Sequence, residues 1–177
     1  MRIILDLCGG TGSWSAPYRE AGYDVRIIDP ICDTGDVRLL PFQGRNIHGI
    51  LCAPPCTVFS YARNRYMPTD KEILEALSVV DACLRIVAIC RPNWWALENP
   101  INKLRTYIGQ PRLAFRQYEY GGHAEKFTGI WGDFKMPYKC RAVRKKPSTF
   151  GTSRQNADPR DAITPPGFAR AFFEVNP

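Results

Sequence analysis

The sequence predicts an α/β fold with a mostly parallel central sheet flanked by helices. Three observations indicate it. Short apolar, β-prone stretches alternate along the chain with stretches of helical spacing. A glycine-rich turn at residues 8–12 follows the first of these stretches. Two later stretches each end in prolines and chemically active side chains, and open α/β sheets build their ligand-binding edge in this way.

The first elements form a βαβ unit. Residues 2–7 are predicted to form a strand, Ser13 to cap a helix running to about Ala21, and residues 24–28 to form a second strand. Asp29 then follows about 20 positions beyond the glycines, a spacing typical of a unit that binds an adenosine-like group. The turn is shorter than the dinucleotide pattern G-x-G-x-x-G, which argues against a dinucleotide oxidoreductase.

The chain is organised around residues 49–60. The first half is apolar and β-prone, so it is predicted to be a buried strand. Pro54 and Pro55 end that strand because proline cannot donate to a sheet ladder. Cys56 follows at the carboxyl end of the strand, where a thiol held by a stiff backbone is a candidate nucleophile. The ordinary alternative is a small buried apolar residue.

The later elements follow from periodicity and from proline. Apolar residues at helical spacing predict a long helix over residues 70–90, which Pro92 prevents from continuing. The next strand is predicted over 93–97 and ends on Glu98. The remaining predictions are a short helix over 101–108, a hairpin of 115–120 with 128–131, and a last helix from Pro165 to Glu174. Residues 132–163 show no strong periodicity, and residues 1–177 are predicted to form one domain.

Composition narrows the class of protein. The formal net charge of +7 suits a polyanionic partner such as nucleic acid, and residues 132–163 contain a basic cluster. The sequence contains neither an apolar run of membrane length nor a signal peptide, so a cytoplasmic protein without a membrane partner is expected. Seven cysteines without a C-x-x-C pair argue against a disulfide framework or a zinc cluster, and a metal site is not expected.

Taken together, residues 6–12, Asp29, Asp36, residues 54–56 and Glu98-Asn99 resemble the DNA cytosine-5 methyltransferase family, and most closely its short, phage-type members. A weaker match covers 120–131, and the last helix is similar to the final motif of the family. The resemblance implies a Rossmann-like S-adenosylmethionine-dependent methyltransferase fold. It also implies methyl transfer to C5 of cytosine in DNA, in the host cytoplasm if the chain is phage-encoded.

The resemblance implies a role for each matching residue. Cys56 would attack C6 of cytosine, Glu98 would bind the N3 and N4 edge of the base, and Pro55 would hold the thiol in place. The implied cofactor is S-adenosylmethionine, with S-adenosylhomocysteine as the product. Its ribose would bind Asp29, and its adenine would lie near Asp36. The full cofactor set is Asp6, Cys8, Gly9, Gly10, Thr11, Gly12, Trp14, Asp29, Pro30, Asp36, Val37 and Pro54.

The target base would be flipped out of DNA, since C5 cannot be reached inside a duplex. The expected nucleic-acid contacts are Thr57, Ser60, Arg63, Arg65, Lys126, Thr128, Arg144, Lys145 and Lys146. The chain also departs from the family pattern. Cys8 replaces an aromatic residue, and Phe127 and Gly129 occupy the arginine positions of a Gln-x-Arg-x-Arg motif. Lys126 or Thr128 is the candidate substitute for those arginines.

Residues 132–163 are much shorter than the target-recognition domain that the family inserts there. Three consequences follow as alternatives: methylation with little sequence preference, recognition by a separate subunit or a homo-oligomer, or an RNA or single-stranded substrate. A different class of function stays open as well. The altered arginine positions are also compatible with a catalytically impaired nucleic-acid-binding or decoy protein.

Overall fold

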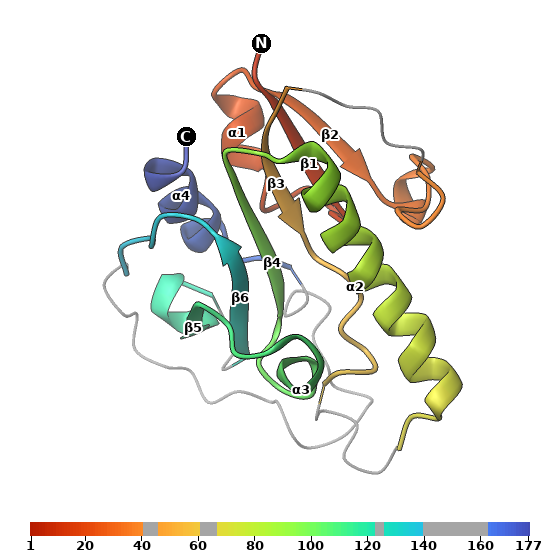
Figure 1. Cartoon of the computed structure of the whole chain (residues 1–177). Helices are drawn as coiled ribbons and strands as arrows, with labels where there is room; N and C mark the ends of the chain where they lie inside the picture. The colour runs from red at the N-terminus through yellow and green to blue at the C-terminus, as the bar shows by residue number, and fades with distance from the viewer. Residues whose placement is uncertain (41–45, 61–66, 123–125, 140–162) are drawn as a thin grey trace.

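A computed structural model describes residues 1–40, 46–60, 67–122, 126–139 and 163–177 (Figure 1). Its centre is a six-stranded sheet in the order β2-β1-β3-β4-β6-β5. The strands are β1 Ile3–Leu7, β2 Asp24–Ile28, β3 Ile47–Cys52, β4 Trp94–Pro100, β5 Leu113–Arg116 and β6 Phe127–Asp133. Strands β1 to β4 pair in parallel, whereas β6 is antiparallel to both β4 and β5. The predicted α/β class with a mostly parallel sheet is confirmed.

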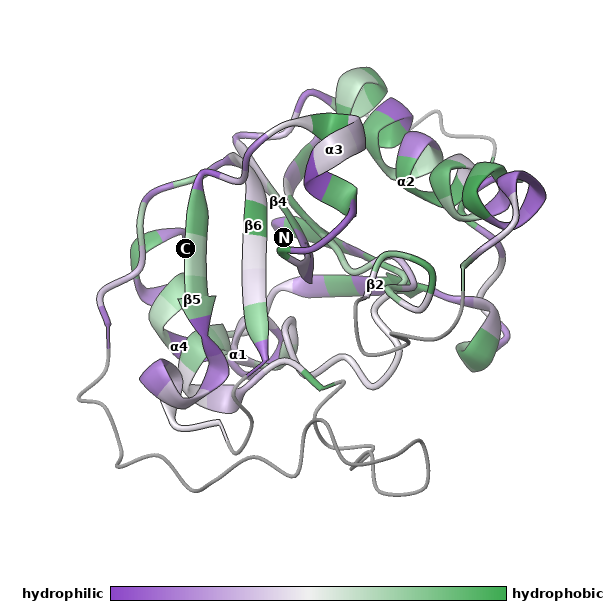
Figure 2. Ribbon diagram, turned by 90° about the horizontal axis from the view of Figure 1, so that it is seen from below, coloured by the Kyte–Doolittle hydropathy of each residue, from purple (hydrophilic) through white to green (hydrophobic). Residues whose placement is uncertain are grey.

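Helices cover both faces of the sheet (Figures 1 and 2). The α-helices are α1 Ala16–Glu20, α2 Asp70–Cys90, α3 Leu104–Ile108 and α4 Pro166–Val175, and the 3₁₀ helices are η1 Pro30–Cys32 and η3 Gln117–Tyr120. Helices α2 and α3 pack on one face in a cluster that includes Ile86 and Leu104. Helices α1 and α4 pack on the other face, where Tyr18 and Phe172 are fully buried.

The long helix confirms its sequence prediction at both ends. Thr69 accepts from the backbone N–H of Glu72, and the Glu72 side chain accepts from the backbone of Thr69, so a complete capping box begins α2. Arg91, in the left-handed region at φ 47°, ends it just before Pro92.

Other predicted boundaries are corrected. Helix α1 begins at Ala16 and not after Ser13, because the Ser13 hydroxyl pairs with Thr11 and Ser15 takes the cap position. The second half of the predicted 115–120 strand is the 3₁₀ helix η3, and α4 begins at Pro166 with Pro165 as its cap.

The sequence predicted that the strand over 93–97 ends at Glu98. In the structure, Glu98 lies inside β4, which continues to Pro100. Pairing of β4 with β3 ends at Leu97, but pairing with β6 continues, so that Glu98 lies opposite Ile130 and Asn99 opposite Gly129. Beyond Cys52, β3 has already turned into the loop with the two prolines. The side chains of the last residues of β4 can therefore reach toward that loop.

Candidate active site

The glycine-rich turn between β1 and α1 forms a compact cradle. Gly12 N–H donates to the carbonyl of Gly9 at 2.8 Å, and Cys8 N–H donates to Ile28 of β2. A side chain at Gly9 could not fit, since its Cβ would lie 2.4 Å from the Asp6 carboxyl carbon. Gly10 differs: its φ of +49° favours glycine, and a Cβ there would meet nothing within 4 Å. The cradle thus has a packed floor and an open rim.

Asp6 lies under this turn and is fully buried. Its Oδ2 accepts from the Ser15 hydroxyl at 2.5 Å, whereas Oδ1 has no hydrogen-bond partner within the described part of the chain. Burial raises the pKa of Asp6 to about 6, against the opposing effects of the Ser15 hydrogen bond and of the Arg19 charge. The geometry makes Asp6 a support of the cradle.

Asp29 joins the end of β2 to the cradle. Its Oδ2 accepts from Gly10 N–H at 2.9 Å and its Oδ1 from Ile31 N–H at 2.8 Å, and the residue is 6% exposed. Each oxygen keeps a second lone pair for a further donor. Pro30 and Ile31 follow in η1, and Ile31 projects an apolar side chain that is 86% exposed. Ile31, two positions after Asp29, was not among the residues predicted from the sequence.

The loop after η1 returns to the same edge of the sheet. Asp36 binds the guanidinium of Arg38, which lowers the Asp36 pKa, and Arg38 also pairs with Glu75 of α2. Val37 is buried in the core beneath α2. The Cys8 thiol has a raised pKa because of its hydrogen bond with Cys83 of α2 and its burial, with smaller contributions from neighbouring carboxylates. Cys8 therefore packs as a core residue.

Two of the predicted cofactor residues, Trp14 and Thr11, contact other side chains in the structure. Trp14 is 3% exposed and packs on Phe168 and Phe172 of α4, at ring-centroid distances of 5.9 and 5.6 Å. Core packing accounts for its burial, and a cofactor contact stays a prediction. Thr11 belongs to the turn and is exposed, and its hydroxyl lies 3.1 Å from that of Ser13.

The loop after β3 is fixed from both neighbouring strands. Ala53 N–H donates to Leu7 of β1 at 2.9 Å, and the Asn99 side-chain amide donates to the Pro54 carbonyl at 2.9 Å. Pro54 is buried and Pro55 is exposed. The Cys56 carbonyl then accepts from the N–H groups of Phe59 and Ser60, which closes a turn with Cys56 at its start. Asn99, which is fully buried, was not predicted as a site residue.

Glu98 and Lys126 form an ion pair at this edge. Lys126 Nζ lies 3.3 Å from Glu98 Oε1, with side-chain exposures of 9% and 14%. The charges of both side chains affect the pKa of the Cys56 thiol. Burial raises the pKa of the Cys56 thiol, the Lys126 ammonium lowers it, and the Glu98 carboxylate raises it. The predicted pair of Cys56 and Glu98 is therefore brought together, with Lys126 as a third member.

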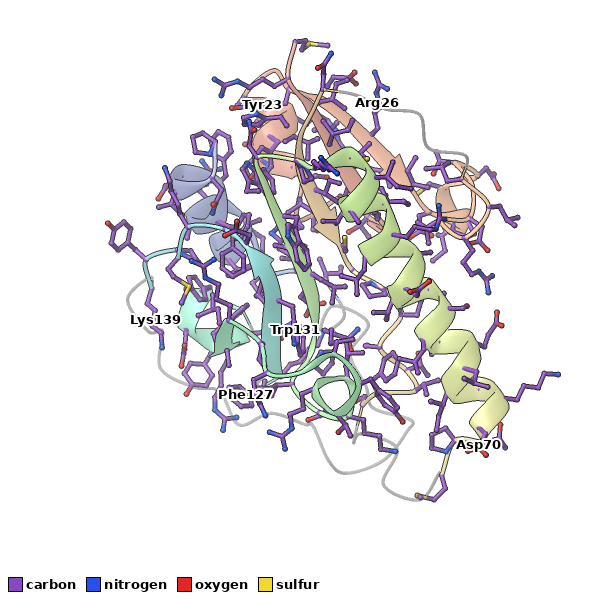
Figure 3. The ribbon with its side chains drawn as sticks, viewed as in Figure 1. Tyr23, Arg26, Asp70, Phe127, Trp131 and Lys139 are labelled. Atoms are coloured by element: carbon purple, nitrogen blue, oxygen red, sulfur yellow. The ribbon has the colours of Figure 1, made fainter. Side chains whose placement is uncertain are left out.

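Phe127 and Gly129, which the resemblance puts at arginine positions, lie on the opposite face of β6 from Thr128 and Ile130. Gly129 packs under the Trp131 ring, and Phe127 lies at the start of β6, 41% exposed, with the Arg116 guanidinium 5.1 Å from its ring centre (Figure 3). Thr128, by alternation along the strand, shares the face of Ile130, the residue opposite Glu98. Thr128 is 2% exposed, and its hydroxyl has no partner among the residues that the structure describes.

Of the other predicted nucleic-acid contacts, only Thr57 and Ser60 lie in the described part of the chain. Thr57 is exposed and Ser60 is half-buried, both in the turn after Cys56. The remaining predicted contacts, Arg63, Arg65, Arg144, Lys145 and Lys146, lie outside the described residues. In the described ranges, we find no group of three or more His, Cys, Asp or Glu side chains that could hold a metal ion. Within the same ranges, every helix is too short or too polar to cross a bilayer.

Comparison with known proteins gives likeness in structure but not in sequence. No family model and no curated protein matches the sequence. A solved structure described as a DNA modification methyltransferase encoded within an E. coli prophage superposes with a TM-score of 0.53 at 18% identity, over 75% of this chain and 47% of that one. Spodoptera frugiperda DNMT2 gives 0.44 at 16% identity, over 85% and 57%. A Pyrococcus horikoshii protein gives 0.39 at 16% identity, over 65% and 57%.

The chain thus spans about half the length of the solved chains that it matches. At this level of identity, the likeness to the prophage protein concerns the fold. The chain therefore has a Rossmann-like α/β fold similar to that of the prophage methyltransferase structure.

Proposed function

We propose that this protein transfers a methyl group from S-adenosylmethionine to C5 of cytosine in DNA, through a covalent bond between Cys56 and C6. The observation that carries the proposal is the grouping of Cys56 with the Glu98–Lys126 pair at one edge of the sheet. The structural neighbour described as a DNA modification methyltransferase supports it. Residues 132–163 would serve as a short basic region in place of a recognition domain.

The cradle fits the proposed cofactor. The open space over Gly10 leaves room for a ligand, and Asp29 keeps lone pairs for the ribose hydroxyls. The exposed Ile31 side chain offers an apolar surface to an adenine ring. When bound, S-adenosylmethionine supplies an electrophilic methyl group. The contribution of the protein is to hold it at the edge where the turn with Cys56 begins.

The residues at that edge can perform the base chemistry. C5 of cytosine is a weak nucleophile, and addition of the Cys56 thiolate to C6 makes the ring enamine-like, so that C5 can take the methyl group. Lys126 favours the thiolate, which burial alone disfavours. The Glu98 carboxyl would bind the N3 and N4 edge of the base. Loss of the C5 proton and release of Cys56 then restore the aromatic ring.

Lys126 is the best candidate to replace the arginines of the related motif. Its amine lies within 3.3 Å of Glu98, so it can hold the carboxyl group in place as well as stabilise the thiolate. Thr128 is the second candidate on that face, and its buried hydroxyl has no partner among the described residues. The target nucleotide would be flipped into this space.

A second candidate function is nucleic-acid binding without turnover. The burial that raises the Cys56 pKa favours it, since a neutral thiol is a poor nucleophile. Methylation of RNA or of a free nucleotide is the remaining alternative, because residues 132–163 are much shorter than a domain that reads duplex DNA. Recognition could also come from a separate subunit or from a second copy of the chain.

Trapping on 5-fluorocytosine DNA tests the proposal. Fluorine at C5 blocks the final elimination, so an active enzyme with S-adenosylmethionine stays attached to the DNA through Cys56. We expect an adduct with the natural chain and with Cys32→Ser, whose sulfur is exposed beside the cradle, and none with Cys56→Ser. Absence of an adduct from the natural chain would contradict methyl transfer. An adduct on fluorinated RNA but not on DNA would reassign the substrate.

A further inference from the structure

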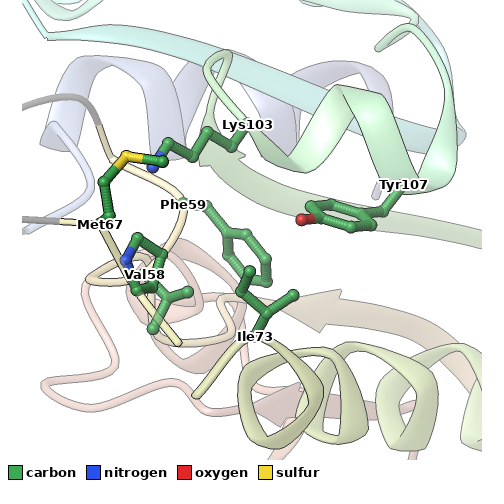
Figure 4. Close-up of a pocket in the computed structure, with 7 residues that line it drawn as sticks. Val58, Phe59, Met67, Ile73, Lys103 and Tyr107 are labelled. Atoms are coloured by element: carbon green, nitrogen blue, oxygen red, sulfur yellow. The ribbon is translucent and has the colours of Figure 1, made fainter. Parts of the chain in front are cut away.

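A separate cavity of about 210 Å³ opens beside the turn that begins with Cys56 (Figure 4). Its lining comes from that turn, from the start of α2 and from α3, and includes Val58, Phe59, Met67, Ile73, Lys103 and Tyr107. Neither Cys56 nor the Glu98–Lys126 pair belongs to this lining. The cavity is therefore a neighbour of the proposed catalytic site and not a part of it.

Backbone hydrogen bonds connect the lining of the cavity to Cys56. Lys103 N–H donates to the Phe59 carbonyl at 3.1 Å, and Phe59 N–H donates to the Cys56 carbonyl at 3.1 Å. The Phe59 side chain is 1% exposed and forms the floor, with the Tyr107 ring at a centroid distance of 6.1 Å. A ligand lying on this floor would consequently have a fixed position relative to Cys56.

The walls suit a flat ring that is attached to a negatively charged group. Phe59, Ile73 and Tyr107 meet at one end, and the Lys103 side chain reaches toward Met67 at the other (Figure 4). Tyr107 is 45% exposed and so offers its ring to a ligand. In the part of the chain that the structure describes, no carboxylate pairs with the Lys103 amine. The volume is below the roughly 300 Å³ at which sites for drug-sized ligands begin, and it suits a single ring system.

We propose that this cavity holds a base of the DNA next to the target cytosine, stacked on Tyr107, with its phosphate at Lys103. Stacking on an exposed aromatic ring beside a cation is how proteins hold nucleic acid without reading its sequence. The proposal rests on the proposed function, because it takes DNA as the substrate that Cys56 attacks. It adds a second point of attachment, which fixes the strand relative to the nucleophile without a large recognition domain.

Binding to abasic DNA tests this proposed base-binding site of Tyr107 and Lys103, which we call the seat. We would measure the affinity of the natural chain for single-stranded oligonucleotides with one cytosine, intact or with an abasic residue on its 5′ or 3′ side. We expect removal of the base on one of the two sides to weaken binding about tenfold or more. Tyr107→Ala should bind intact DNA as weakly as the natural chain binds that abasic DNA, and should show no further loss on it. Tyr107→Phe keeps the ring and should behave as the natural chain.

Substitutions of Lys103 and of a control cation, Arg170, complete the experiment. Lys103→Gln should weaken binding and reduce its salt dependence, whereas Arg170→Gln, on the exposed side of α4, should do neither. An abasic penalty of equal size in Tyr107→Ala and in the natural chain would overturn the seat, and so would a natural chain that does not bind DNA.

The covalent readout separates this proposal from the proposed function. Cys56→Ser should form no adduct with 5-fluorocytosine DNA and yet keep the abasic penalty that depends on Tyr107. Adduct formation without any effect of Tyr107→Ala would overturn the seat and leave methyl transfer standing. A penalty that depends on Tyr107 without adduct formation by the natural chain would support the seat and contradict methyl transfer.

Discussion

The side-chain amide of Asn99 donates a hydrogen bond of 2.9 Å to the carbonyl oxygen of Pro54. It joins the two strand ends that carry Glu98 and Cys56, and Asn99 is fully buried. Removal of the amide leaves a buried carbonyl without its donor, which costs about 1–3 kcal/mol. Asn99→Leu should lower the free energy of unfolding in urea by about that amount. Asn102→Leu, at a partly exposed position nearby, should change it little.

Loss of this bond should also release the turn with Cys56. The rate of iodoacetamide labelling at Cys56, followed by mass spectrometry of its peptide, should rise in Asn99→Leu under native conditions. An unchanged labelling rate together with a large loss of stability would show that Asn99 supports the core and not the nucleophile.

The charges around Cys56 predict opposite effects of two substitutions. Lys126 lowers the pKa of the thiol and Glu98 raises it, while burial raises it most. Lys126→Gln should therefore move the pH profile of Cys56 alkylation to higher pH, and Glu98→Gln should move it to lower pH. Arg116→Gln is the matched control, because Arg116 is not among the groups that shift the Cys56 pKa, and its profile should stay that of the natural chain. Shifts of the same sign in the first two variants would contradict the arrangement.

Asp6 predicts a pH dependence of stability. Burial raises its pKa to about 6 from 3.8, so the folded state binds the proton more tightly than the unfolded state does. The stability that this proton contributes is complete below the unfolded pKa and is lost as the pH rises through 6. The loss amounts to roughly 3 kcal/mol at neutral pH. Between pH 4 and 7, the free energy of unfolding of the natural chain should thus fall relative to that of Asp6→Asn.

Ser15→Ala supplies the control for this effect. The Ser15 hydroxyl lowers the Asp6 pKa, so its removal should raise that pKa further and make the loss of stability with pH larger. Parallel pH profiles for the natural chain and Asp6→Asn would show that Asp6 titrates normally in the folded state.

The sequence predicted the sheet and α2 because proline and apolar periodicity act within a few residues. The meeting of Cys56 with Glu98 was expected instead from the rule that parallel strands end at one edge of a sheet. The roles of Lys126 and Phe127 depend instead on the register of β6 against β4, in which a shift of one residue moves every side chain to the other face. The sequence left Lys126 and Thr128 as equal candidates to replace the arginines of the motif, and the structure places the Lys126 amine 3.3 Å from Glu98. Ser15 was not predicted as a site residue, because its hydrogen bond to Asp6, nine positions earlier in the sequence, is visible only in the structure.

Gly9 and Gly10 are adjacent but should respond differently to alanine. In Gly9→Ala the new Cβ would lie 2.4 Å from the Asp6 carboxyl carbon, so the turn or β1 must shift, and we expect a loss of several kcal/mol in the free energy of unfolding. Gly10→Ala meets open space, and only its φ of +49° is unfavourable, at a cost of about 1–2 kcal/mol. If the space over Gly10 holds the cofactor, Gly10→Ala should stay folded and bind S-adenosylhomocysteine at least tenfold more weakly in calorimetry. Gly22→Ala, with a φ of +82° and open space at the end of α1, carries the same backbone strain away from the cradle and should bind normally. Equal affinities in the Gly10 and Gly22 variants would place the cofactor elsewhere.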